Sequence, residues 1–221
     1  MKQILAIALS LVMATSLQAQ ELEYKMELGG LLGANFYLGD ANYSTLYKNT
    51  HPAAGIMARY NMNPRMALKF DLAATKISGN ALDGPTRYPE APAEQSWQFS
   101  NTLVDLSCQY ELNAWAYGTG QGFKGTRRLT PYIQMGLGFT YAASTLTMHI
   151  PLGIGVKYKL KERWNCGVDW TVRLSMSDKL DGISDPYNIK SGLLKNKDSY
   201  SMTVFYISYD LFPKYRECNN D

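Results

Sequence analysis

The residues that could carry out chemistry in this chain are few, and histidine is the scarcest of them. The sequence contains only His51 and His149. A histidine beside an acid and a serine can act as a general base for a nucleophile. His51 follows a segment that holds Asp40 and Ser44, so a lipid-acting hydrolase is one hypothesis for this place. The spacing is not diagnostic and a polar surface histidine is the simpler interpretation, so we expect no enzyme activity and no cofactor.

The three cysteines, Cys108, Cys166 and Cys218, do not predict a metal site. None of them has a cysteine or histidine neighbour at the spacing of a zinc ligand set. Because three is an odd number, at least one thiol is unpaired or pairs with another chain. Cys108 and Cys166 fall on apolar strand faces and are expected to contact lipid. Cys218 is expected to be free, with an intermolecular disulfide as the alternative.

The N-terminus has the form of a secretory signal peptide. A positively charged start at Lys2 precedes an apolar run from Ile4 to Ala14, and small and polar residues follow. We therefore predict a signal peptide over residues 1–19, with cleavage after Ala19. An N-terminal membrane anchor is the weaker alternative, because a spanning helix needs about 20 apolar residues.

Eight stretches after the signal alternate apolar and polar residues with a period of two, as half-buried β-strands do. In the seventh, Val168 and Trp170 alternate with Asp169 and Thr171. The eight strands are expected at about 24–38, 53–62, 66–77, 99–112, 131–141, 148–160, 164–176 and 200–212. The length of 221 residues fits one domain, and the net charge of +3, without a basic stripe, argues against a nucleic-acid binder.

The strands are expected to close into a barrel in a membrane. Hydrocarbon offers no hydrogen-bond partner to an open sheet edge, and single-chain barrels of bacterial outer membranes have an even number of strands. A soluble barrel or a sandwich would carry more charge on its polar face. The predicted fold class is therefore all-β, an eight-stranded antiparallel transmembrane β-barrel of the outer-membrane type over residues 20–212, followed by a periplasmic tail over 213–221.

Two groups of side chains are expected to mark the faces of this barrel. Aromatic residues near strand ends should form girdles at the two membrane interfaces: Tyr24, Tyr60, Trp97, Tyr110, Tyr132, Tyr158, Trp164 and Tyr200. Charges of both signs should fill the interior and pair there: Lys25, Glu27, Arg59, Lys69, Asp71, Asp105, Glu111, Lys157, Lys159, Asp169 and Arg173. In the fourth strand the phase changes before Val104, and a bulge could correct it.

The connections predict which end of the barrel faces outward. Long connections at about 39–52, 78–98 and 178–199 share one end with a short one at 142–147, which suggests the external side. The other end, with 61–65, 113–130, 160–163 and both termini, should be periplasmic. The 113–130 segment is unusually long for that side and carries three basic and three aromatic residues: Lys124, Arg127, Arg128, Trp115, Tyr117 and Phe123. It is either a solvated loop or a docking loop, since arginine and aromatic residues favour interfaces.

Five segments have a familiar order and spacing: ELGGLLGANFYLGDAN, AAGIMARYNMNPRMALKFDLA, RRLTPYIQMGLGFTY, PLGIGVKYKLKERWNCGVDW and SDKLDGIS. Together they resemble the PorG-like small outer-membrane barrels of the Bacteroidetes type IX secretion system. The resemblance covers about residues 24–212 and rests on no single motif. It implies a non-enzymatic barrel that associates with the periplasmic ring lipoprotein of the secretion machinery, with candidate contacts at Asn63, Pro64, Arg65, Arg127 and Arg128.

The sequence thus supports two classes of function. The first is a structural component of type IX protein secretion, located in the outer membrane with both termini in the periplasm. Its partner-binding residues are expected to be Arg127, Arg128, Phe123, Lys124, Asn63, Pro64 and Arg65. The alternative is a surface barrel whose long outer loops bind an external ligand. Outer-membrane lipid is the expected surrounding in both cases, with no nucleic acid, metal or small-molecule substrate.

Overall fold

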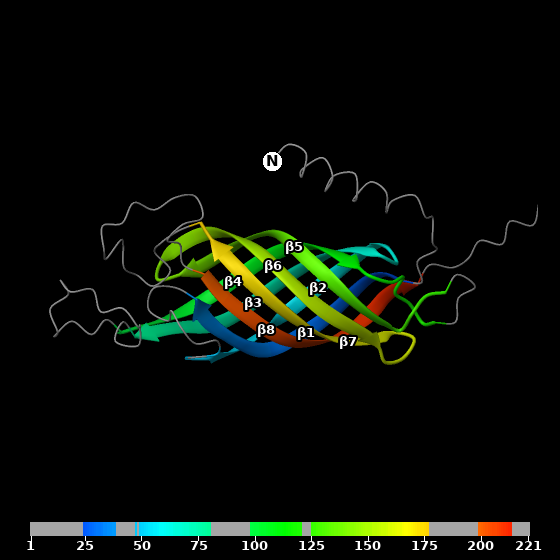
Figure 1. The fold of residues 1–221 in the computed structure, drawn as a ribbon, viewed down its shortest axis with the longest axis horizontal. Coiled ribbons are helices and arrows are strands. Elements are labelled where there is room, and N and C mark those ends of the chain that lie inside the picture. The colour runs from blue at the N-terminus through cyan, green and yellow to red at the C-terminus, as the bar shows by residue number, and fades with distance from the viewer. Residues whose placement is uncertain are drawn as a thin grey trace, which may run out of the picture.

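The structure is a computed structural model that describes residues 24–38, 47, 49–80, 98–120, 125–176 and 199–213. Each strand in it pairs antiparallel with the next along the chain, and the last pairs with the first, so the sheet is a closed barrel (Figure 1). This confirms the predicted fold class. The strands are β1 (Tyr24–Leu38), β2 (His51–Asn63), β3 (Met66–Asn80), β4 (Gln98–Asn113), β5 (Leu129–Ala142), β6 (Thr145–Lys159), β7 (Trp164–Ser175) and β8 (Ser199–Pro213).

Several predicted features lie outside the described residues. They are the signal peptide 1–19, the tail beyond Pro213 with Cys218, and most of the three long connections. The short connection between β5 and β6 is described, and it is tighter than predicted. Ala143 and Ser144 are its only residues between the two strands, with φ angles of 48° and 61°. Two positive φ angles in a two-residue loop match the twist of an antiparallel hairpin.

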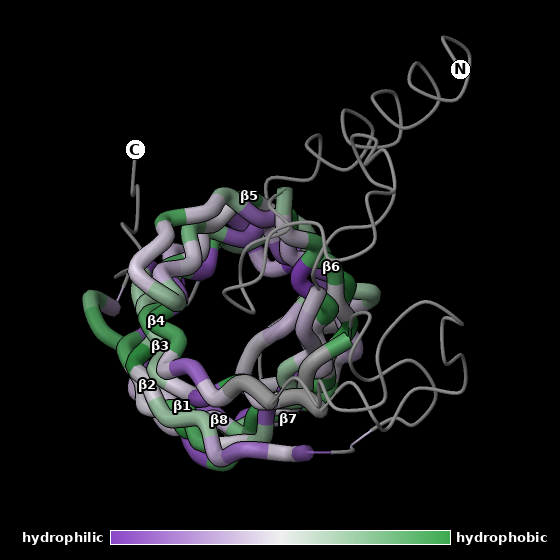
Figure 2. The backbone as a smooth tube through the Cα atoms, turned by 90° about the vertical axis from the view of Figure 1, so that its left-hand side faces the viewer, coloured by the Kyte–Doolittle hydropathy of each residue, from purple (hydrophilic) through white to green (hydrophobic). Residues whose placement is uncertain are grey.

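The barrel has two ends: the collar end, where the β2–β3 turn and the β4–β5 connection form a hydrogen-bonded collar of residues 63–65, 113–120 and 125–128, and the loop end. The collar end holds the start of β1 and the finish of β8, where Tyr24 pairs with Pro213. It also holds the β2–β3, β4–β5 and β6–β7 connections. The loop end holds the three long connections and the β5–β6 turn. Figure 2 looks along the barrel and shows the strands closing into a ring.

The outer wall of the barrel is apolar, which is the reverse of a soluble protein. Leu32, Ile56 and Leu146 are 66%, 63% and 67% exposed, and they alternate along their strands with side chains that point inward. The free cysteines Cys108 and Cys166 lie on the same outward face, half-buried among apolar neighbours, as predicted. An apolar wall around a polar interior requires a surrounding of lipid, so the molecule is a transmembrane barrel of the outer-membrane type rather than a soluble one.

The interior holds charges of both signs in nearly equal number. In the described part of the chain, buried groups include five bases, Arg59, Lys69, Lys157, Lys159 and Arg173, and six acids, Glu27, Asp71, Asp105, Glu111, Asp169 and Asp210. Ten of these eleven groups are on the predicted interior list. Lys25 was also predicted there and is exposed, because it lies at the collar end next to the start of β1. Asp210, on β8, was not on that list and joins the interior network.

Glu111 of β4 is the acceptor on which three interior bases converge. Its carboxylate lies 3.0 Å from Arg59 Nε, 3.1 Å from Lys157 Nζ and 3.9 Å from Lys69 Nζ. Arg59 reaches a second acid, since its Nη1 is 2.5 Å from Glu27 Oε2. Buried charges are tolerated only when they are paired in this way, so the ion pairs fix the positions of the side chains that fill the barrel.

A second cluster surrounds Asp105 nearer the loop end. Arg173 Nε and His149 Nε2 each lie 3.2 Å from Asp105 Oδ2, and the Tyr200 hydroxyl donates to the same carboxylate. Around and beyond this cluster the interior is partly apolar, with buried side chains from six strands: Leu31, Ala53, Met57, Ala73, Ile77, Leu103, Ala142, Met202 and Val204. The sequence did not predict this apolar part, because single inward apolar residues look like breaks in the alternation.

Two of the predicted girdle tyrosines are inside the barrel instead. Tyr132 is 3% exposed and Tyr200 is fully buried. The Tyr132 hydroxyl donates to Asp169, and its ring fills a hollow left by Gly155, where a Cβ would lie 2.5 Å from Tyr132 Cζ. The expected bulge in β4 was also wrong, because the pairing of β4 with β3 runs without a register shift from Leu112 to Gln98.

We expect this filled interior to block ion flow. Purified protein in planar bilayers should show conductance near background, because paired side chains from all eight strands occupy the lumen. Stepwise conductance well above background would contradict the filled barrel.

Glu111→Gln should strongly destabilise the barrel, because it leaves Arg59 and Lys157 buried with one acid fewer. Breaking a buried pair costs about 3–5 kcal/mol in the free energy of unfolding. Urea unfolding followed by tryptophan fluorescence measures the change. Glu162→Gln is the matched control, since Glu162 is exposed in the β6–β7 connection and its loss should stay within about 0.5 kcal/mol. Equal effects of the two substitutions would contradict the role of Glu111.

Candidate docking site at the collar end

The structure brings the predicted contact residues together at one end of the barrel. Asn63, Pro64 and Arg65 form the tight β2–β3 turn, in which Asn63 Oδ1 accepts a hydrogen bond of 2.8 Å from the Arg65 backbone N–H. Such a side-chain acceptor two residues earlier is typical of turns that begin with asparagine. Arg127 and Arg128 lie in the β4–β5 connection at the same end. Phe123 and Lys124 lie outside the described residues.

Backbone hydrogen bonds fasten the β4–β5 connection onto this turn. The Asn113 N–H donates to Arg65 O at 2.7 Å, and the Tyr117 N–H donates to Pro64 O at 2.9 Å. The Asn113 side chain adds a bond of 3.0 Å to Pro64 O. We call residues 63–65, 113–120 and 125–128 the collar. Its two contact segments, predicted separately, therefore form one structure.

Hydrogen bonds also join two segments of the collar, residues 113–120 and 125–128, to each other. Arg127 N–H donates to Ala116 O at 2.7 Å, and Gly118 N–H donates to Arg127 O at 3.1 Å. Arg128 Nε donates to Thr119 O at 2.8 Å. These bonds hold both arginines in place although both are exposed. A solvated, loosely held loop was the alternative interpretation of this segment, and the described parts of it are hydrogen-bonded.

Tyr117 connects the collar to the barrel interior. Its hydroxyl donates to Asn165 Oδ1 at 2.8 Å, and Lys157 Nζ lies 5.0 Å from the centre of its ring. Asn165 in turn donates to Asp210, which lies 2.6 Å from Lys159 Nζ. Burial raises the pKa of Tyr117 well above its usual range, so the phenol stays protonated and remains a donor.

Arginine and tryptophan pair on the exposed side of the collar. The Arg127 guanidinium carbon lies 4.8 Å from the centre of the Trp115 ring, and the indole is 40% exposed. Stacking of this kind stabilises by about 0.5–1 kcal/mol at exposed sites and presents a flat, polar-edged surface. Among the described residues, the exposed charges at this end are mostly basic: Lys25, Arg127, Arg128, Lys161 and Arg163, with Glu162 as an acid. The collar end therefore favours an acidic partner surface or an anionic headgroup.

The roles of the residues that hold the collar in place were not predicted from the sequence. Tyr117 and Trp115 were noted as part of an aromatic loop, but their anchoring and stacking roles were not predicted. Asn113 and Asn165 gave no signal, because an asparagine near a strand end is common. What they do depends on the carbonyls of the β2–β3 turn and on Asp210, which are distant in sequence.

Of the three residues in the histidine hypothesis, the structure describes His51. His51 Nε2 lies 2.6 Å from Ser78 Oγ, on the neighbouring strand at the loop end, and the predicted grouping of His51 with Asp40 and Ser44 stays a prediction. Asp40 and Ser44 lie outside the described residues. In the described part of the chain, no group of three histidine, cysteine or acidic side chains could hold a metal ion. Among those same residues there is no apolar helix of the length that crossing a bilayer requires.

A family model that matches nearly the whole sequence shows the family of the chain. The chain belongs to the family described as a domain of unknown function, DUF6089, whose model matches residues 2–220. No protein with a curated description matches it.

The chain is similar to several solved structures of outer-membrane proteins. The chain is similar to the N-terminal β-barrel domain of Pseudomonas aeruginosa OprF, with 10% identity, a TM-score of 0.47, and coverage of 85% of this chain and 98% of that chain. For OprG of Pseudomonas aeruginosa these values are 9%, 0.48, 85% and 96%. For Neisserial surface protein A they are 14%, 0.47, 84% and 96%. The fold assignment rests on the strand pairing and the polar interior rather than on these similarities.

Removing the Tyr117 side chain should release the collar. Tyr117→Ala loses both the ring between Lys157 and Lys159 and the bond to Asn165, so local opening should become easier. Trypsin cleavage after Arg127 and Arg128 should accelerate by roughly tenfold or more, because cleavage follows the population of the open form. Tyr158→Ala, on the outer wall, is the control and should leave the rate unchanged. An unchanged rate in Tyr117→Ala would show that the tyrosine does not hold the collar.

Proposed function

We propose that the protein is a non-enzymatic outer-membrane barrel whose collar docks the periplasmic ring lipoprotein of the type IX secretion machinery. The observation that carries the proposal is the collar itself. A barrel without a binding partner at this end would need only short turns between its strands there, whereas the β4–β5 connection is long and hydrogen-bonded. The partner is suggested by the resemblance to PorG-like barrels, and the docking surface by the described contacts.

The distribution of connections supports a periplasmic position for the collar. The two longest connections, residues 81–97 and 176–198, are both at the loop end, and in barrels of this type long loops lie outside and short turns lie in the periplasm. The strand ends nearest both termini, Tyr24 and Pro213, are at the collar end. A signal peptide over residues 1–19, cleaved after Ala19, would deliver the chain to this location, with residues 213–221 as a periplasmic tail.

The collar has the chemistry of a protein-binding surface. Tryptophan and arginine are the residues that most often dominate binding energy, and Trp115 with Arg127 supplies both in one stacked pair. Because hydrogen bonds already hold the collar, docking would cost little conformational entropy. The surplus of exposed basic side chains at this end suits an acidic surface on the lipoprotein.

The remaining polar groups support a structural role rather than catalysis. His149 is fully buried and already contacts Asp105 and Thr140 inside the barrel. His51 is paired with Ser78 at the loop end. An enzyme that used His51 to activate a serine would act on lipid at the membrane surface. A His51→Ala variant with an unchanged lipid profile would therefore support the structural role.

The docking proposal is tested with a photo-crosslinking amino acid placed at Arg128. We expect a crosslink to the ring lipoprotein from this position and none from Leu146, which is exposed at the loop end. The Arg127→Ala, Arg128→Ala double variant should lose co-purification of the lipoprotein, since a hot-spot residue contributes about 2 kcal/mol, or roughly thirtyfold in affinity. Lys76→Ala, exposed near the loop end, is the matched control.

The outcome also separates the two classes of function. Co-purification that survives the double variant, together with normal secretion, would overturn the docking proposal. Removal of residues 81–97 should leave secretion unchanged if the collar is the functional surface. Loss of function on that deletion, with the collar intact, would instead favour a barrel whose outer loops bind an external ligand.

A further inference from the structure

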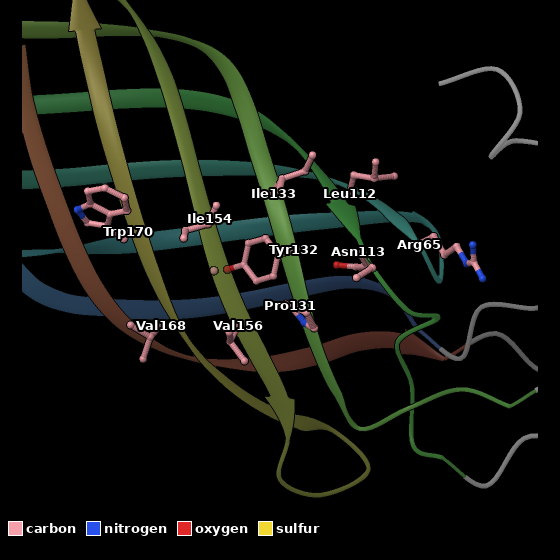
Figure 3. A pocket seen from close by; sticks show the side chains of 12 residues that line it. Arg65, Leu112, Asn113, Pro131, Tyr132, Ile133, Ile154, Val156, Val168 and Trp170 are labelled. Atoms are coloured by element: carbon pink, nitrogen blue, oxygen red, sulfur yellow. The ribbon is translucent and has the colours of Figure 1, made fainter. Parts of the chain in front are cut away.

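An apolar groove of about 690 Å³ runs across the outer wall of the barrel from β4 to β7 (Figure 3). Two rows of outward side chains form its sides. One row is built from successive cross-strand partners: Leu112, Ile133, Ile154 and Trp170. Pro131, Val156 and Val168 form the other row in the same way. Between them the floor is backbone, because Tyr132 points inward and Gly155 has no side chain.

The groove rises from the collar end toward the middle of the membrane. Leu112 is followed in β4 only by Asn113, whereas Ile133 lies four positions beyond Leu129 at the start of β5. Trp170 lies six positions beyond Trp164 at the start of β7. The tilt of the strands therefore makes one end of the groove shallow and the other deep. Three strand intervals of about 4.8 Å give a length of about 14 Å, close to half of the roughly 30 Å hydrocarbon core.

Among the residues that the structure describes, one cation, Arg65, lines the shallow end. Arg65 belongs to the β2–β3 turn, and Figure 3 shows it at the opposite end of the groove from Trp170. Its Nε is buried and has no hydrogen-bond partner among the described residues. A buried donor on a charged group normally has an acceptor, so the site is incomplete as it stands. Its backbone carbonyl accepts a hydrogen bond from the Asn113 N–H in the collar, and Arg65 also lines the end of the groove.

We propose that this groove binds an anionic phospholipid, with one acyl chain between the two rows of side chains and the phosphate on Arg65. The apolar rows match an acyl chain in composition and in length. Guanidinium binds phosphate with two parallel hydrogen bonds, which would satisfy the unpaired Nε. The basic side chains around the collar end add attraction for a negatively charged headgroup. The proposal does not depend on the docking of a protein to the collar.

Trp170 at the deep end provides a direct probe. A variant in which Trp97, Trp115 and Trp164 are replaced by phenylalanine keeps Trp170 as its single tryptophan, since the chain has four. It is reconstituted in vesicles of phosphatidylcholine that contain increasing fractions of brominated phosphatidylglycerol or brominated phosphatidylcholine. Bromine quenches the indole when the acyl chain occupies the groove. We expect half-maximal quenching at a roughly tenfold lower fraction of phosphatidylglycerol, as one charge-assisted hydrogen-bonded contact would give.

Three further variants in this background decide the proposal. Arg65→Gln should abolish the preference for phosphatidylglycerol, because glutamine keeps a polar hydrogen-bonding group but not the charge. Val156→Phe should lower quenching by both lipids, because the ring fills the groove. Arg163→Gln is the control, since Arg163 is exposed at the same end and does not line the groove. An unchanged preference in Arg65→Gln, or an equal loss in Arg163→Gln, would overturn the proposal, since the second result means that diffuse charge attracts the lipid.

Discussion

The constraint on which the structure depends is that hydrocarbon cannot hydrogen-bond to a peptide backbone. A sheet in that surrounding must close on itself, and β8 therefore pairs with β1 along most of its length. Closure sends alternate side chains into a lumen too narrow for a water-filled channel. The inward charges must then find partners in one another, and convergence of Arg59, Lys157 and Lys69 on Glu111 is the result.

A filled lumen limits where this protein can interact with anything else. The interior groups are buried and already paired, so the surfaces left for function are the two ends and the outer wall. At the collar end, Tyr117 of the collar donates a hydrogen bond to Asn165. Asn165 in turn donates to Asp210 of the interior network. The described part of the collar is thereby connected to the same ionic network that fills the barrel, so the collar proposed for docking is held by hydrogen bonds.

The outer wall is shaped by the same packing. The inward ring of Tyr132 needs the space above Gly155, and a side chain at that position would collide with it. Tyr132 and Gly155 therefore belong both to the interior network and to the floor of the lateral groove. Arg65 similarly takes part in two structures, since its carbonyl accepts a hydrogen bond in the collar and the residue lines the end of the groove. Interior, collar and groove are consequences of a single arrangement of strands.

The sequence by itself determined the strands, their order, the outward apolar face and most of the buried charges, because a period of two is a local property that closure in lipid leaves unchanged. It also pointed to the two segments that form the collar. Only the tertiary structure decided that Tyr132 and Tyr200 point inward, that His51 pairs with Ser78, and which charges meet. Those outcomes depend on the stagger between neighbouring strands, which places residues far apart in the chain at one level of the barrel, and no single segment encodes that stagger.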